Sequence, residues 1–207
     1  MSATHAMYAK KICEHIQLMY GVKLKKYNLI YGSIKPDISM LFPKHPHYIN
    51  ESLDNLCCTA DMLIESTENK DEIETRAFSR ELGVVLHYVT DFFCMVHNDV
   101  NGKKHPTNYR HVVYEQNFQN KLKTYELDEV REDVANRLPQ DIQKIESTSL
   151  KDYIVFRHKK YMKEIGKSYL YNSYNKKRNI DINYSFGMSI EMASYIINSI
   201  LSNKKGK

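Results

Sequence analysis

The stretch that decides the fold is LGVVLHYVTDFFCMVHND, which runs from Leu82 to Asp99. Its apolar residues would cover most sides of a helix, which indicates a helix buried on most of its surface. His87, Asp91 and His97 interrupt this apolar run. Because buried ionisable groups are costly unless they are paired or bind a metal, the stretch predicts either a polar core or a metal site.

The spacing of histidines and carboxylates points to metal chemistry. His87 and Asp91 are four residues apart, so on a helix their side chains project from one face. His111 and Glu115 repeat this spacing in the next predicted helix. A helix that carries histidine and carboxylate at this spacing can offer two ligands to one zinc ion. One such pair is usually an ordinary surface pair, whereas two pairs on neighbouring helices leave a metal site and a structural role both open.

Apolar spacing and the scarce glycine and proline residues predict an all-α fold. We expect one domain over residues 1–207, with the ligand-bearing part at about 4–116 and no β-hairpin or internal repeat. Thr4 is the predicted N-cap of the first helix, and a turn is predicted from Gly32 to Asp37. The predicted helices cover residues 4–20, 24–31, 50–65 and 73–97, one that begins at Pro106, and two near 150–165 and 182–202.

Charge, hydropathy and cysteine spacing bear on the partners and the location of the protein. The net charge of +5 is mild and the basic residues are dispersed, so the sequence does not indicate a nucleic-acid partner. It shows no secretory signal and no apolar run near the roughly 18 residues that span a bilayer. The four cysteines lack the spacing of a disulfide framework. We therefore expect a cytoplasmic protein with reduced thiols.

Further ligand-type residues lie nearer the N-terminus. His5 falls on the predicted buried side of the first helix, and Asp37 and His47 flank a loop with proline residues. Each alone is more typical of a cap, a turn or a surface residue, and His45 competes with His47. The histidines that fit no pattern, expected on the surface or in packing, are His15, His105 and His158.

At these residues the sequence resembles the zinc-dependent phospholipase C family, all-α enzymes that hold three zinc ions in a cleft. The similarity covers Thr4 to about Gln116. The matching motifs are the opening histidine in THA (4–6), the Pro-Asp turn in GSIKPD (32–37), the histidine that begins HYINESLD (47–54), HYxxD at 87–91 followed by His97, and HxxxE at 111–115.

The resemblance implies a set of eight ligands for two or three zinc ions. It assigns one ion to Asp37, His47, His87 and Asp91, a second to His97, His111 and Glu115, and a third to His5 and Asp91. Asp91 would bridge two ions, and Asp37 would also act as the general base or orient the attacking water. In secreted members an N-terminal tryptophan completes the third site. Because this sequence has no tryptophan, water or the start of the chain would have to replace it.

The resemblance also implies phosphodiester hydrolysis by water that zinc activates. The expected substrate is a phospholipid headgroup or a small soluble phosphodiester, with peripheral membrane contact as an option. Two alternatives stay open. Three-zinc nucleases share the fold and most of the ligand pattern, but they close with HxxxD after a longer interval. A catalytically inactive paralogue could keep the ligands as a structural zinc core.

Overall fold

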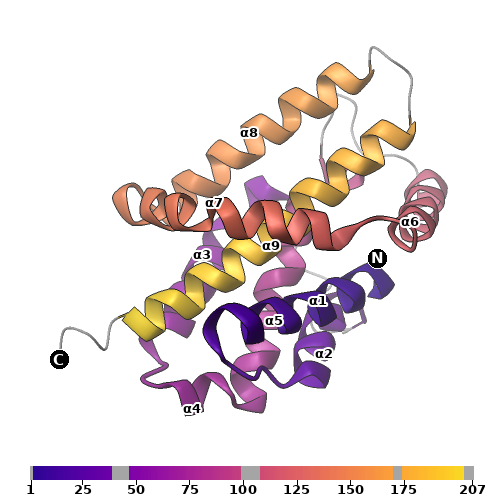
Figure 1. The fold of residues 1–207 in the computed structure, drawn as a ribbon. Helices are drawn as coiled ribbons and strands as arrows, with labels where there is room; N and C mark the ends of the chain where they lie inside the picture. The colour runs from indigo at the N-terminus through magenta and orange to yellow at the C-terminus, as the bar shows by residue number, and fades with distance from the viewer. Residues whose placement is uncertain (1, 39–46, 99–107, 170–173, 203–207) are drawn as a thin grey trace.

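The computed structural model describes residues 2–38, 47–98, 108–169 and 174–202, and this part of the chain is helical without a strand (Figure 1). The prediction of an all-α fold is thereby confirmed. The helices are α1 (Ser2–Tyr20), α2 (Lys26–Ile38), α3 (Ile49–Glu65), α4 (Lys70–Ile73), α5 (Arg76–Phe92), α6 (Asn108–Leu122), α7 (Leu127–Ser147), α8 (Leu150–Tyr169) and α9 (Tyr174–Ser202), with a 3-10 turn, η1 (Met95–His97), after α5.

The long C-terminal helix α9 crosses the middle of the molecule (Figure 1). It packs against α5 and α7, and also contacts α1, α3 and α8. Ile182, Phe186, Ile190, Ala193 and Ile197 of α9 are fully buried. Their spacing of three and four residues forms an apolar stripe along the helix. Helix α9 is therefore the element on which the other layers are assembled.

Two glycines bring α2 and α5 into backbone contact. A Cβ atom at Gly32 would lie 2.0 Å from the carbonyl oxygen of Arg80, and one at Gly83 would lie 2.5 Å from that of Leu29. Any side chain at either position would force the helices apart. This close approach brings the carbonyl oxygen of Ser33 to the buried imidazole of His87.

The predicted turn from Gly32 to Asp37 is wrong, because α2 continues through it to Ile38. Gly, Ser and Pro-Asp are local turn signals, but here the contact with α5 requires helical backbone at Gly32. Pro36 lies in the last turn of the helix, where its missing N–H removes one hydrogen bond but little helix follows to be disrupted.

Other elements also differ from the prediction, including α9, which begins at Tyr174 and not near residue 182. Helix α1 already begins at Ser2, so Thr4 lies inside it and is not its N-cap. The single helix predicted over residues 73–97 is divided, because Thr75 caps α5 by accepting a hydrogen bond from the Phe78 N–H, and the chain leaves the helix after Phe92. Helix α7 was not predicted, since its polar sequence contains Pro139. The predicted start at Pro106 lies outside the described residues.

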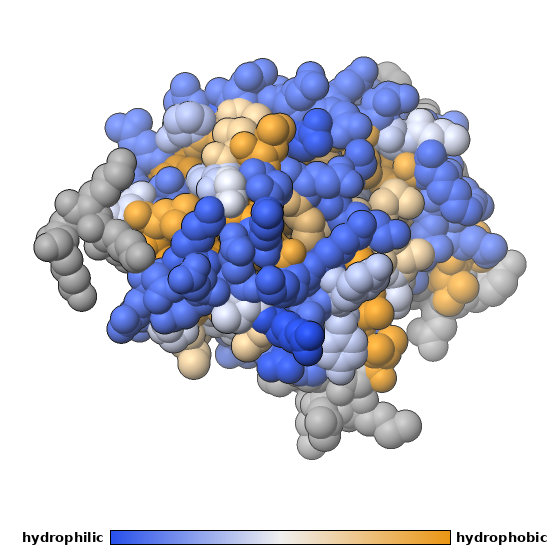
Figure 2. Space-filling view, turned by 60° about the horizontal axis from the view of Figure 1, so that its bottom comes forward, coloured by the Kyte–Doolittle hydropathy of each residue, from blue (hydrophilic) through white to orange (hydrophobic). Residues whose placement is uncertain are grey.

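Surface hydropathy and helix length bear on whether the described residues could enter a membrane. The face shown in Figure 2 is predominantly hydrophilic, with apolar residues in small separate patches. None of the helices in the described ranges combines the length and apolar character needed to cross a bilayer.

Candidate metal centre

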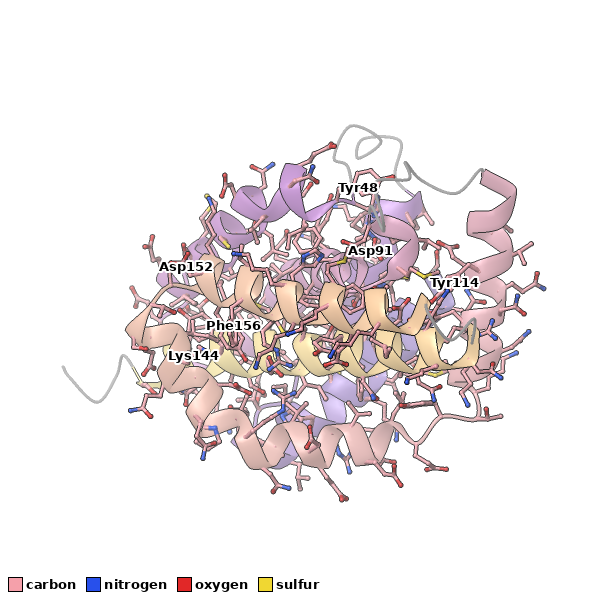
Figure 3. All side chains as sticks on the ribbon, turned by 90° about the horizontal axis from the view of Figure 1, so that it is seen from above. Tyr48, Asp91, Tyr114, Lys144, Asp152 and Phe156 are labelled. Atoms are coloured by element: carbon pink, nitrogen blue, oxygen red, sulfur yellow. The ribbon has the colours of Figure 1, made fainter. Side chains whose placement is uncertain are left out.

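The carboxylate of Asp91 is the centre of a buried group of histidines. Asp91 lies on the last turn of α5 in the interior of the molecule (Figure 3), with 1% of its side chain exposed. Its Oδ1 atom is 3.4 Å from Nε2 of His5 and 3.8 Å from Nε2 of His97. Its Oδ2 atom is 2.6 Å from Nδ1 of His47 and 3.3 Å from Nε2 of His87. Each carboxylate oxygen therefore faces a different pair of imidazoles.

The backbone of α2 sets the orientation of His87. Its Nδ1–H donates a hydrogen bond of 2.9 Å to the carbonyl oxygen of Ser33, which leaves the lone pair on Nε2. Burial lowers the pKa of His87 to about 3, although the charge of Asp91 opposes this, so the ring is neutral at pH 7. A backbone carbonyl that fixes the tautomer in this way is typical of metal-binding histidines.

The atoms that surround His87 Nε2 are mostly acceptors. Oδ2 of Asp91 lies 3.3 Å away and Oδ1 of Asp37 lies 3.8 Å away. Nδ1 of His47, at 3.0 Å, carries one proton that it donates to Asp91. Asp91 and His87 are buried and Asp37 reaches them from the surface. Two carboxylates and an imidazole lone pair this close repel one another, and a cation between them would relieve the repulsion.

The donor set fits zinc. One ligand atom each from His5, Asp37, His87 and Asp91 lies within 4.8 Å of the others. Tetrahedral zinc with ligands at about 2.0 Å places them about 3.3 Å apart, so a small adjustment would close the group. Neither ring nitrogen of His5, nor Oδ1 of Asp91, has a hydrogen-bond partner in the described part of the chain. Imidazole and carboxylate ligands without thiolate suit a hydrolytic zinc site.

The histidines control the ionisation of Asp91. Burial alone would raise the pKa of Asp91, but the neighbouring His97, His87 and His5, together with the hydrogen bond from His47, hold it well below its usual value. For His47 burial acts in the opposite direction and lowers the pKa of the imidazole, but the hydrogen bond to Asp91 and the charge of Asp91 outweigh burial and raise the pKa above its usual value. The carboxylate is therefore ionised and available to a cation at neutral pH.

His97 reaches the group because the chain leaves the helix before it. The side-chain amide of Asn98 donates to the carbonyl oxygens of Phe92 and Cys94, at 3.0 and 2.8 Å, and so holds the end of α5. Nε2–H of His158, on α8, donates to Oδ1 of Asn98 at 2.7 Å. A contact from α8 therefore supports the turn that carries His97.

The structure brings together six of the eight predicted ligands: His5, Asp37, His47, His87, Asp91 and His97. Glu115 lies half-buried on α6, which follows η1 in the sequence, whereas Asp91 precedes η1. Burial raises the pKa of the Cys94 thiol well above its usual value, and the charges of Asp181, Asp91 and, least of all, Glu115 add to this. The backbone of His111 belongs to α6, but its side chain is not among the described parts of the structure. His45 lies outside the described residues.

Sequence reasoning missed three supporting groups. The Ser33 carbonyl is a backbone atom and has no residue-type signal. Asn98 follows His97 directly, and its position after a buried histidine could have marked it as a helix-ending residue. His158 was expected on the surface or in packing; it packs, half-buried, and also supports Asn98.

Comparison with known proteins gives one positive result. The family model described as zinc dependent phospholipase C matches residues 4–168, which is well over half of the chain. No curated protein and no solved structure matches. The family match extends beyond Gln116, where the sequence motifs end, through α7 and most of α8.

Proposed function

This chain belongs to the zinc-dependent phospholipase C family, and we propose that it hydrolyses a phosphodiester with water activated by zinc. The substrate would be a phospholipid headgroup ester or a small soluble phosphodiester. The observation that carries the proposal is the convergence of the partly exposed Asp37 carboxylate on the buried Asp91 carboxylate and the His87 lone pair, an arrangement that a cation would stabilise. Zinc, when bound, would polarise the phosphate and make a nucleophilic water available at neutral pH.

The residues would divide into three ligand groups. The larger group would be Asp37, His47, His87 and Asp91, the second would be His97, His111 and Glu115, and His5 with Asp91 would hold a further ion. In the structure, however, it is His5 that lies with Asp37, His87 and Asp91, whereas Nδ1 of His47 is hydrogen-bonded to Asp91, so His5 and His47 would compete as the fourth ligand of the first ion. The opposite directions in which the Asp91 oxygens face support its bridging role, since Oδ1 faces His5 and His97 while Oδ2 faces His47 and His87.

Asp37 is the residue we assign to proton transfer. Its side chain is 23% exposed, whereas Asp91 is 1% exposed, so a substrate or water can reach Asp37. The Ser2 hydroxyl donates a hydrogen bond of 3.1 Å to Oδ2 of Asp37, which orients the carboxylate. Oδ1 remains directed toward His87. A carboxylate in this position can orient an attacking water and accept its proton.

The test is hydrolysis by protein purified without chelator. A chromogenic phosphocholine ester and single-stranded DNA are assayed side by side, before chelation, after chelation and after zinc is returned. Asp37→Asn is compared with Asp54→Asn, a control at an exposed carboxylate on α3 that is paired with Lys151. We expect Asp37→Asn to lower kcat by about 10²-fold or more, in the range of acid–base catalysis, and Asp54→Asn to leave it unchanged.

The other candidate functions give different results. Hydrolysis of DNA but not of the phosphocholine ester would favour the nuclease alternative. Zinc without hydrolysis of either substrate would favour a structural zinc core. Equal activity of chelated and zinc-loaded protein would contradict zinc-dependent hydrolysis.

A further inference from the structure

A buried carboxylate outside the predicted ligand set connects the elements that carry the second ligand group. Asp181 lies on α9 and is fully buried. Its Oδ2 atom accepts a hydrogen bond of 2.9 Å from the Met95 backbone N–H and one of 2.5 Å from the Tyr114 hydroxyl. Its Oδ1 atom accepts one of 2.8 Å from the Tyr161 hydroxyl. One side chain therefore joins η1, α6 and α8 to α9.

The contact with Met95 fixes the turn that carries His97. Met95 is the first residue of η1, and His97 is the last. Because η1 is a single turn, holding its first N–H limits the direction in which His97 projects. The hydrogen bond comes from α9, whereas the Asn98 contact at the other end of η1 comes from α8.

The contact with Tyr114 fixes the rotation of α6. Tyr114 is three residues after His111 and directly before Glu115, and its side chain is 6% exposed. Since residues three and four apart share a helix face, anchoring Tyr114 determines which way positions 111 and 115 face. Helix α6 stands at one edge of the molecule (Figure 1), and Figure 3 shows Tyr114 on the side of α6 that faces the remaining helices.

We propose that Asp181 is a positioning residue for the second zinc ion. It holds η1 and α6 so that His97, His111 and Glu115 can meet at one ion, and it does not contact the ion itself. This inference rests on the proposed function, because it requires that these three residues bind zinc.

The chain offers matched controls for this role. Glu191 is a second buried carboxylate on α9, 1% exposed, that accepts a hydrogen bond from the Tyr153 hydroxyl at 2.9 Å. It contacts α7 and α8 through Arg137 and Arg157, and none of these elements carries a predicted ligand. Glu191→Gln therefore removes a buried charge from α9 without removing a contact to η1 or α6.

A second pair of variants compares the two tyrosines that donate to Asp181. Tyr114→Phe and Tyr161→Phe each remove one hydroxyl from the same carboxylate, but only α6 carries predicted ligands. The readout is zinc retained per chain after equilibration with a chelator of graded concentration, together with the melting temperature and helix content of each variant.

We expect Asp181→Asn and Tyr114→Phe to bind their weakest zinc ion about tenfold or more weakly, the range seen when residues that support metal ligands are lost. Glu191→Gln and Tyr161→Phe should retain zinc like the wild type even where they melt earlier. Higher free zinc should restore the hydrolysis rate of Asp181→Asn. Added zinc would not restore the rate if the substitution had only damaged the fold.

The outcomes separate this inference from the proposed function. If the wild type binds zinc and all four variants retain it equally, the positioning role is overturned while the proposed function stands. Zinc loss that follows melting temperature across all four variants, Glu191→Gln included, also overturns it. A wild type that binds no zinc overturns the proposed function, and the positioning role with it.

Discussion

Replacing Asp91 with asparagine tests the bridging carboxylate, because the substitution preserves size and removes the charge. In the structure the two Asp91 oxygens face two separate pairs of imidazoles, and under the proposed ligand groups the change would affect two ions at once. Glu115→Gln is the comparison, since Glu115 belongs to one ligand group only. We therefore expect Asp91→Asn to release more zinc than Glu115→Gln.

The magnitude follows from the number of ions affected. Losing even a supporting group costs about 10–100-fold in metal affinity, so a shared ligand should cost at least about 10²–10⁴-fold over two ions. That corresponds to about 2.7–5.5 kcal/mol. Because zinc binds the folded chain, the loss also lowers stability, by roughly 5–20 °C in melting temperature for a chain of this size.

The assay is zinc per chain by elemental analysis after dialysis, followed by thermal melting with and without chelator. The difference in melting temperature between Asp91→Asn and wild type should shrink when both are chelated. Zinc loss no greater than in Glu115→Gln would refute the bridging assignment. A melting difference that chelation leaves unchanged would show that Asp91 acts on the fold and not through metal.

Two further predictions concern packing and pH. Gly83→Ala should lower stability by about 1–3 kcal/mol and reduce zinc retention, because its Cβ would press on the α2 backbone that orients His87. Gly166→Ala, with no atom within 4 Å of the new Cβ, should stabilise the fold by about 0.5–1 kcal/mol. Thermal melting and zinc analysis of both variants check this, and equal zinc retention with equal melting would contradict it. Burial lowers the pKa of His15 to about 4, with Arg131 adding to the effect. As the pH falls below about 6.5 the unfolded chain binds a proton before the folded chain does, so the folded state loses about 3 kcal/mol of stability by about pH 4. His15→Gln should flatten that part of the pH–stability curve, and denaturation curves with the wild-type slope would count against it.

The sequence was enough to find the residues that cluster around Asp91, because metal chemistry restricts residue type and spacing together; their roles as ligands stay predictions. His87 and Asp91 share a helix face by position alone, and an apolar run around them indicates burial. His5 was expected on the buried side of the first helix, and it lies there with 1% of its side chain exposed. Local patterns of this kind are complete within a few residues, so one sequence is enough to find them.

The support around the ligands could not be predicted in the same way. The Ser33 carbonyl reaches His87 only because Gly32 and Gly83 let two helices meet, and glycine at those positions looks locally like a turn. Asp181 lies 84 residues after His97 in sequence, and no local pattern links a carboxylate on α9 to η1. Such contacts depend on how the helices pack, which spacing within one helix does not encode.

The most direct test of the central claim is the zinc content of wild-type protein purified without added metal or chelator. The Asp91 carboxylate, Asp37 and the His87 lone pair should hold zinc tightly, so we expect two or three ions per chain by elemental analysis, in line with the three proposed ligand groups. Those ions should resist dialysis and leave only with a strong chelator, and the melting temperature should fall as they leave. Protein with less than one zinc per chain, and a melting temperature that added zinc does not raise, would contradict the account.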